Sequence, residues 1–546
     1  MVASSERSLP APLRRRAAAR LWRWGGQPPA GVALIVVLIA LVGYTRLVGF
    51  ETLHIFGLAH TLNDQVAYVD AARHLRDDGE LTTGIIYPYS LRQDYSRNFF
   101  YPPGHAVVLA LSLAVFGDGV WQAILPSVIG YLGSVFLVFV IGRRLRDTSV
   151  GIWAALLFAV FAPNVVYAMT AMAEETFLCA CLMAFSGFLL LPGRLRPFLG
   201  PLLLILPFLF RETGSLWVIP MAFVILEAYP IRRRGYSVAA AFVAASVVVL
   251  SAVYRTEWLS DRPSRLWQNL STSEFDLMYA DAFGVIAAPE SLGGWLGILA
   301  SHAVSSLSGL IGVLGGKPTS FEAVSLHLLL WPIALVALLW RLGLGVRQIN
   351  RACLATGLTL VVLISFLYSW DHYVGVRQLL LLLPLESIAL AAGAGQWLSG
   401  LEERKRRLCG ATVVLCLVLG SGYQLLRAAD EVKEWDDLFA AVERSLRVIG
   451  PDTNGTLIAP YWVGAAFVHT AYPAQWAFSP ANPATLELLH EKHPVRTAIL
   501  PLPEFRSLGT GVLERIELSY AGRVELGGVT HLVYRSAGAA TNPDAK

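Results

Sequence analysis

The stretch Gly119–Gly142 reads GVWQAILPSVIGYLGSVFLVFVIG, and Arg143 and Arg144 follow it directly. It holds no acidic or basic side chain over 24 residues, and a helix needs about 20 apolar residues to cross a bilayer. Basic residues gather on the cytoplasmic side of membrane proteins. The stretch therefore predicts a membrane-spanning helix whose end at Arg143 lies in the cytoplasm.

The composition of the whole chain agrees with such helices. Of 546 residues, 55% are hydrophobic and 15% are charged, whereas soluble proteins average about 25% charged residues. The mean hydropathy is +0.55. A soluble globule of this length cannot hide so much apolar surface behind so few charges, which excludes an ordinary soluble enzyme, a disordered chain and a fibrous protein. The net charge of +4 is small, so we expect no nucleic acid partner.

Eleven apolar runs predict an all-α polytopic membrane protein with about eleven transmembrane helices. The longer runs are 31–50, 119–142, 236–254, 322–341, 352–370, 378–396 and 408–426. The shorter runs are 149–163, 176–191, 198–210 and 214–229. Two further stretches fit a crossing badly, because 105–117 is too short and 291–313 is rich in Gly and Ser. We interpret both as re-entrant or interfacial segments.

The distribution of charge sets the orientation. With a cytoplasmic N-terminus, the cytoplasmic pieces hold 21 basic and four acidic residues. These pieces are 1–30, 143–148, 192–197, 231–235, 341–351 and 397–408. The external loops 51–104 and 255–290 hold seven basic and 13 acidic residues. This asymmetry predicts a multi-pass protein of the cell inner or plasma membrane, and an odd number of crossings leaves the C-terminus outside.

The chain then divides into three parts, which are a basic cytoplasmic N-terminus (1–30), a transmembrane domain (31–429) and a small extracytoplasmic α/β domain (430–546). Residues 431–448 predict an amphipathic helix. Short strands are predicted at Thr456–Ala459 and Arg496–Leu500, and a hairpin at Arg523–Arg535. We find no internal repeat, although inverted repeats are typical of many transporters.

The first external loop carries an acidic residue at the start of a predicted helix. Asp64 precedes apolar residues at helical spacing, which are Val66, Val69, Ala72 and Leu75. This pattern favours an amphipathic helix on the membrane surface. Asp64 could be a helix N-cap, since Asp is favoured there, or a catalytic carboxylate, and the two roles do not exclude each other.

Two more features lie on the same predicted face. The segment Tyr101-Pro102-Pro103-Gly104-His105 ends the first loop and starts the short run 105–117. Glu174 and Glu175 stand at the outer end of the run 176–191. Charges at a membrane boundary cost less than charges at its centre, so simple exposure also explains these two carboxylates.

Taken together, these features resemble the GT-C class of multi-spanning glycosyltransferases. The resemblance includes Arg377, which leads into the apolar segment Leu379–Leu385. More narrowly, the chain is similar to the branch that holds the protein O-mannosyltransferases and the lipid A aminoarabinose transferases, over about residues 30–426. The resemblance implies an inverting transfer of a sugar from a polyprenyl-phosphate donor in the membrane lipid to an extracytoplasmic acceptor, which can be a lipid, a glycan or a protein.

The resemblance also implies roles for the acidic residues. Asp64 matches the catalytic aspartate of the first loop, and Glu174 or Glu175 matches the second acidic position, which binds the acceptor or a metal. The family usually has Asp-Glu in the first loop, whereas this chain has Asp64-Gln65. No cofactor is implied with certainty, and a divalent metal stays open, with Asp64 and Glu174 as its candidate ligands.

The leaving phosphate needs a cation, and three arginines are candidates: Arg377, Arg211 and Arg97. Snorkelling or a structural ion pair is the alternative for each. The candidates for contact with the substrate are Tyr101, His372 and Tyr373.

Two other functions stay open. A transporter or flippase of a lipid-linked substrate is the alternative, because Glu386 falls about 12 Å into the run 378–396 at 1.5 Å per residue, and an intramembrane carboxylate is usually functional. A third is a scaffold without catalysis, in which the tail domain docks a partner.

Overall fold

The computed structural model describes residues 62–86, 102–192, 195–203, 205–211, 383–399, 455–459, 475–478, 483–526 and 529–536, with isolated positions elsewhere. The predicted spans 31–50, 236–254, 322–341 and 352–370 lie outside these residues, as does the predicted helix 431–448. Nearly all of 214–229, 291–313 and 408–426 lies outside them too.

The predicted span 119–142 is the helix α5 (Val120–Leu145), with Arg143 and Arg144 in its last turn. Within the described part of the chain it is the one helix long and apolar enough to cross a membrane. Other predicted spans coincide with shorter helices. These are α6 (Thr148–Val160), α8 (Glu174–Leu190), the pair α9 (Arg196–Leu203) and α10 (Ile205–Phe210), and α20 (Leu383–Ser399).

Helix α5 packs closely against its neighbours through glycines. A Cβ atom on Gly130 would lie 2.8 Å from the carbonyl carbon of Glu175 in α8, and one on Gly142 would lie 2.9 Å from the Cα atom of Gly151 in α6. Small residues let helix backbones approach each other, as is common between membrane helices. The hydroxyl of Tyr131 also donates to the carbonyl oxygen of Ala159 at 2.7 Å. The start of α8 is therefore fixed against the middle of α5.

Helix α3 (Leu62–Asp77) packs against helix α4 (Pro103–Phe116). Near their beginnings the rings of Tyr68 and His105 meet edge to face, with centroids 4.8 Å apart. Near their ends Arg73 reaches Asp118, just after α4, at 3.0 Å. Helix α4 has 14 residues, about 21 Å at 1.5 Å per residue, which is shorter than the roughly 30 Å hydrocarbon core of a bilayer.

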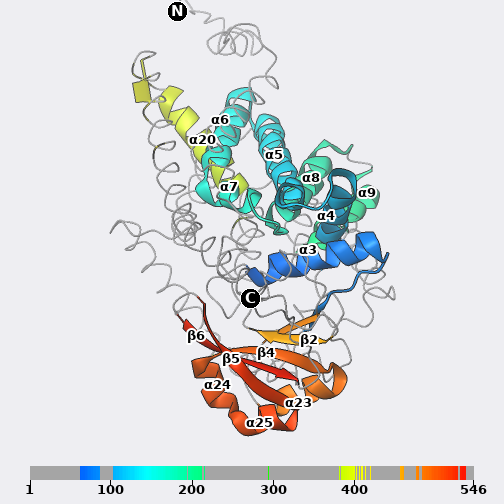
Figure 1. Ribbon diagram of the computed structural model, residues 1–546. Coiled ribbons are helices and arrows are strands. Elements are labelled where there is room, and N and C mark those ends of the chain that lie inside the picture. Colours follow the sequence, from blue (N-terminus) through cyan, green and yellow to red (C-terminus); the bar gives the residue numbers. More distant parts are fainter. Residues whose placement is uncertain are drawn as a thin grey trace, which may run out of the picture.

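The first half of α3 is an internal helix, so the prediction of an amphipathic surface helix is wrong for this half. Three of the four residues of the expected apolar face, Val66, Val69 and Ala72, are buried, but so are most of the positions between them. Seven residues are at most 3% exposed, namely Gln65, Val66, Ala67, Tyr68, Val69, Ala71 and Ala72. The exposed side chains of α3 and of the turn after it come at its end, from Asp77 onward. Figure 1 shows α3 between the other helices and the sheet.

A six-stranded sheet follows at the other side of α3, with the strand order β1-β3-β2-β4-β6-β5. Its strands are β1 (Ile85–Ile86), β2 (Thr456–Ala459), β3 (Gln475–Phe478), β4 (Val495–Pro501), β5 (Leu518–Leu526) and β6 (Val529–Ser536). The first four in this order pair in parallel, and β4, β6 and β5 pair antiparallel. The structure thus has β2 on the predicted residues, β4 over the predicted strand, and a β5–β6 hairpin at the predicted place.

The core of the sheet region is apolar and fully enclosed. Three helices, α23 (Pro483–Lys492), α24 (Leu502–Leu508) and α25 (Thr510–Arg515), accompany the strands. Side chains from these helices, among them Leu489 and Leu513, are buried in one cluster with Ile458 and Leu500 of the strands. Each fully buried Leu or Ile contributes about 1.5–3 kcal/mol relative to exposure.

The sheet also takes a strand from the first loop, which the sequence did not predict. Ile85 and Ile86 of β1 pair with Trp476 and Ala477 of β3. The turn between α3 and β1 is held by Asp70, whose Oδ2 accepts hydrogen bonds from the Thr83 hydroxyl at 2.6 Å and the Gly84 amide at 2.7 Å. The sheet is therefore not confined to residues 430–546, and the first loop is part of it.

Candidate functional site

The candidate site is built around the segment that precedes α8. This segment follows α7 (Ala162–Ala168), and its residues Met169 to Ala173 are all buried. Buried backbone groups outside regular structure must find hydrogen-bond partners. Here side chains from three helices supply them. Gln65 of α3 accepts from the Ala171 amide at 3.2 Å, His105 of α4 contacts the Ala171 carbonyl at 3.0 Å, and Ser127 of α5 donates to the Met172 carbonyl at 3.0 Å.

Glu174, the first residue of α8, forms an ion pair with Arg211. Nη1 of Arg211 donates to Oε1 of Glu174 at 2.6 Å. The Glu174 side chain is 2% exposed and the Arg211 side chain 17%, so water screens this pair little. The start of a helix also favours a negative charge. The structure thus joins a residue predicted as catalytic with one predicted to bind phosphate, and it agrees with the alternative of an ion pair for Arg211.

Glu175 has a different environment from its neighbour. It is 0% exposed, and its backbone lies against Gly130 of α5. Among the residues that the structure describes, neither of its carboxyl oxygens has a hydrogen-bond partner. Burial of an unpartnered carboxylate is costly. The two adjacent glutamates, which the sequence could not tell apart, therefore differ in their partners.

Asp64 is the third residue of α3, and its side chain is not among those described. Because the helix begins at Leu62, Asp64 lies within the first turn rather than at the N-cap position. The remaining candidates, Arg97, Tyr101, His372, Tyr373 and Arg377, lie outside the described residues. Their roles stay predictions.

Sequence reasoning missed the residues that hold the segment before α8. Gln65 was noticed as a departure from the Asp-Glu pattern, but no structural role followed from it. His105 and Ser127 are polar residues inside apolar runs, and that position is the one signal that could have identified them. All three are 0% exposed.

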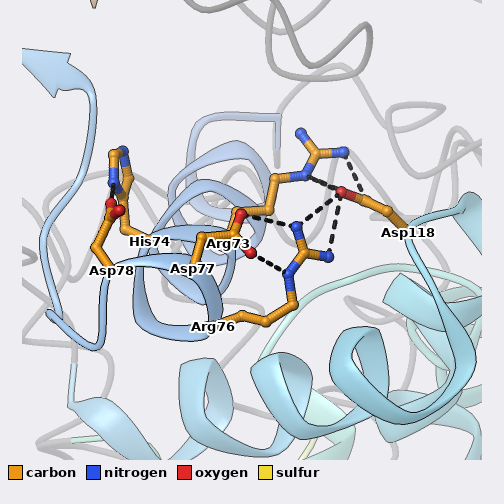
Figure 2. Close-up of polar contacts among 6 residues, drawn as sticks. All are labelled: Arg73, His74, Arg76, Asp77, Asp78 and Asp118. Carbon is orange, nitrogen blue, oxygen red and sulfur yellow. Dashed lines mark hydrogen bonds and ion pairs between the residues drawn. The ribbon is translucent and has the colours of Figure 1, made fainter.

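A charged cluster joins the end of α3 to the turn between α4 and α5 (Figure 2). Arg73 binds Asp118 at 3.0 Å, and Arg76 binds Asp118 at 3.3 Å and Asp77 at 2.6 Å. His74 contacts Asp78 at 2.8 Å. Hydrogen bonds from Arg76 hold the pKa of Asp77 below its usual value. We call Arg73, Arg76 and Asp118 the α3 latch, because they fix the far end of α3.

Two expectations concern single carboxylates. Glu386 is buried and lies in the first turn of α20, which begins at Leu383. In the part of the chain that the structure describes, no three His, Cys, Asp or Glu side chains lie close enough to hold a metal. Of the two candidate metal ligands, Glu174 already has the positive charge of Arg211 beside it.

These helices have the fold of the GT-C class of polytopic membrane glycosyltransferases. Two solved structures of ArnT from Cupriavidus metallidurans match this chain at 13% sequence identity. The one bound to undecaprenyl phosphate has a TM-score of 0.52 and covers 94% of this chain and 99% of its own. The one in the apo state has a TM-score of 0.51 and covers 92% and 97%. An Archaeoglobus fulgidus oligosaccharyltransferase, in a complex with Zn and sulfate, matches with a TM-score of 0.51 at 13% identity over 90% of this chain and 71% of its own.

A family model matches part of the sequence. Residues 101–256 match the model of the dolichyl-phosphate-mannose-protein mannosyltransferase family. This segment contains His105, Glu174, Glu175 and Arg211. No curated protein matches the chain in sequence. The resemblance to GT-C glycosyltransferases that the sequence motifs predicted is confirmed by the fold and by this family match.

Proposed function

We propose that the chain is an integral-membrane, inverting glycosyltransferase that moves a sugar from a polyprenyl-phosphate donor to an acceptor at the extracytoplasmic face. The observation that carries the proposal is the Glu174–Arg211 pair, at 2.6 Å, inside the segment that matches the mannosyltransferase family. The matched family is described by a dolichyl-phosphate sugar, and the matched ArnT structure is bound to undecaprenyl phosphate. Both are polyprenyl phosphates.

The proposed membrane arrangement has about eleven crossings, a cytoplasmic N-terminus and an extracytoplasmic C-terminal sheet. Its support is the excess of basic residues in the predicted cytoplasmic pieces. Helix α5 supports it too, because it spans the predicted run and ends at the paired Arg143 and Arg144. A many-helix body suits a donor whose long apolar tail stays in the bilayer.

In the proposed reaction the acceptor hydroxyl oxygen attacks the anomeric carbon of the sugar. Asp64 takes the proton of that hydroxyl as the general base. The bond between the anomeric carbon and the phosphate oxygen breaks on the opposite face, and polyprenyl phosphate leaves with the bonding electrons. Arg211 stabilises the charge on the leaving phosphate. A divalent metal, if the enzyme uses one, would add positive charge near Asp64 and Glu174.

We assign the second acidic position to Glu174 rather than to Glu175. Glu174 is bound to the arginine that would meet the phosphate, whereas Glu175 packs on α5. Glu174 would orient Arg211 and the acceptor.

The test begins with the lipid-linked sugars of cells that have or lack the protein. We expect one polyprenyl-phosphate sugar to accumulate when the protein is absent. The purified protein should release polyprenyl phosphate from that species when an extract of the cells that lack the protein supplies the acceptor. The Asp64→Asn variant should fold and should not release it. An unchanged pool of lipid-linked sugars would refute the transferase function, and full release by Asp64→Asn would refute the base assignment.

A further inference from the structure

Both polar groups of one buried peptide residue are held by side chains from two different helices. The amide of Ala171 donates to Oε1 of Gln65 at 3.2 Å, and its carbonyl lies 3.0 Å from Nε2 of His105. Ala171, Gln65 and His105 are all 0% exposed. Hydrogen bonds buried from water keep their geometry, because a group that loses its partner cannot turn to solvent.

The hydrogen positions of this contact follow from the chemistry of the groups. A carbonyl oxygen only accepts, so Nε2 of His105 carries the hydrogen of its bond to Ala171. The other ring nitrogen, Nδ1, lies 2.9 Å from the hydroxyl of Thr176 in the first turn of α8. The ring of Tyr68, from α3, packs edge to face against the same imidazole. His105 is therefore fixed by α3 and α8 at once.

The residues of this contact lie close in sequence to the proposed site residues. Gln65 directly follows Asp64, the proposed base, and Ala171 lies three residues before Glu174. We infer that Gln65 and His105 are positioning residues, which hold Asp64 and the Glu174–Arg211 pair in register by fixing Ala171. We call this contact the Ala171 clamp. This inference rests on the proposed function. The role that it assigns to Gln65 needs an oxygen that accepts a hydrogen bond and does not need a negative charge.

Three variants separate positioning from mere stability. Gln65→Leu removes the acceptor, Gln65→Glu keeps an acceptor oxygen at the same place, and Tyr131→Phe removes a buried hydrogen bond between α5 and α6 that does not involve the segment before α8. Misplacement of reacting groups by about 1 Å can cost about 10²-fold in rate. We expect Gln65→Leu to lower kcat by about 10²-fold with little change in KM for the donor. Gln65→Glu should restore most of the rate, and Tyr131→Phe should stay close to wild type.

Hydrogen exchange tests the clamp without relying on catalysis. The Ala171 amide should exchange faster in Gln65→Leu than in wild type, and at the wild-type rate in Gln65→Glu. The clamp is overturned if this amide is unaffected, or if Gln65→Leu and Tyr131→Phe lower kcat by the same factor. If wild type releases no polyprenyl phosphate, the proposed function fails, and the exchange of Ala171 still decides whether the clamp exists.

Discussion

The Glu174–Arg211 pair gives the sharpest prediction, because its two partners can be removed singly and together. The perturbations are Glu174→Gln, Arg211→Gln and the double variant. The matched control for Glu174→Gln is Glu175→Gln, the same substitution at the next residue. The carboxyl group that it removes has no hydrogen-bond partner among the described residues.

The expected magnitude follows from distance and burial. Two unit charges about 4 Å apart attract by about 4 kcal/mol at an effective dielectric constant near 20, and this pair is closer, at 2.6 Å. Removing one partner of a fully buried pair costs about 3–5 kcal/mol. Arg211 keeps 17% of its side chain in contact with solvent, and glutamine keeps an oxygen that can accept its hydrogen bond. We therefore expect Glu174→Gln to cost about 2 kcal/mol and Arg211→Gln about 3 kcal/mol.

The assay is the free energy of unfolding in detergent micelles, combined with release of polyprenyl phosphate. The double variant should lose about 1–2 kcal/mol less than the sum of the single variants, since neither charge is then left alone. Glu175→Gln should leave the free energy of unfolding unchanged or raise it, and should retain release. Losses that add within about 0.5 kcal/mol would show that the pair does not form. Loss of release in Glu175→Gln but not in Glu174→Gln would reverse the assignment of the two acids.

Three further predictions concern the ends of α3 and the sheet. Asp118→Asn should remove the ion pairs of the α3 latch. We expect the free energy of unfolding to fall by about 1 kcal/mol at low salt and by less at high salt, measured by unfolding at two ionic strengths. An equal loss at both would contradict an ionic origin. Asp70→Ala should remove the hydrogen bonds that Asp70 accepts from the Thr83 hydroxyl and the Gly84 amide. In hydrogen exchange, the Gly84 and Ile85 amides should then exchange faster, while the Leu500 amide in β4 stays protected. Unchanged exchange at Gly84 would contradict the role of Asp70. Burial lowers the pKa of His531 in β6. The histidine therefore binds a proton more readily in the unfolded chain than in the folded one. The stability of the sheet should fall as the pH drops below about 6.5, the pKa of a free histidine. His531→Gln should flatten this dependence between pH 7 and pH 5 in hydrogen exchange, and an unchanged slope would show that another group is responsible.

Local patterns predicted the elements whose signals lie within one segment. The uncharged run of 24 residues, Gly119–Gly142, predicted both ends of α5 (Val120–Leu145) to within three residues. The strand β2 and the β5–β6 hairpin followed from short apolar runs and the paired glycines at 527 and 528. These elements depend on their own residues, because length, periodicity and turn chemistry are local properties.

The elements that the sequence did not predict depend on distant partners. A two-residue strand such as β1 has no periodicity, and its pairing with β3 joins residues nearly 400 positions apart. The burial of Gln65 depends on the amide of Ala171, 106 residues away. The different partners of Glu174 and Glu175 also depend on residues that are distant in sequence, Arg211 and Gly130. Adjacent residues on a helix point about 100° apart, so one meets Arg211 while the other packs on α5.

The first-loop segment 62–86 contacts each part of the protein that the proposed reaction needs. Through Gln65 it binds the segment before Glu174, through the α3 latch it binds the turn between α4 and α5, and through β1 it joins the C-terminal sheet. Gln65 lies near the start of α3, and Asp70 in the same helix binds Thr83 and Gly84, the two residues before β1. Because Gln65 and Asp70 belong to one helix, a shift of β1 at its edge with β3 would be passed through Gly84 and Asp70 to the helix that carries Asp64 and Gln65. The C-terminal sheet is therefore connected, through segment 62–86, to the helix that carries the proposed base.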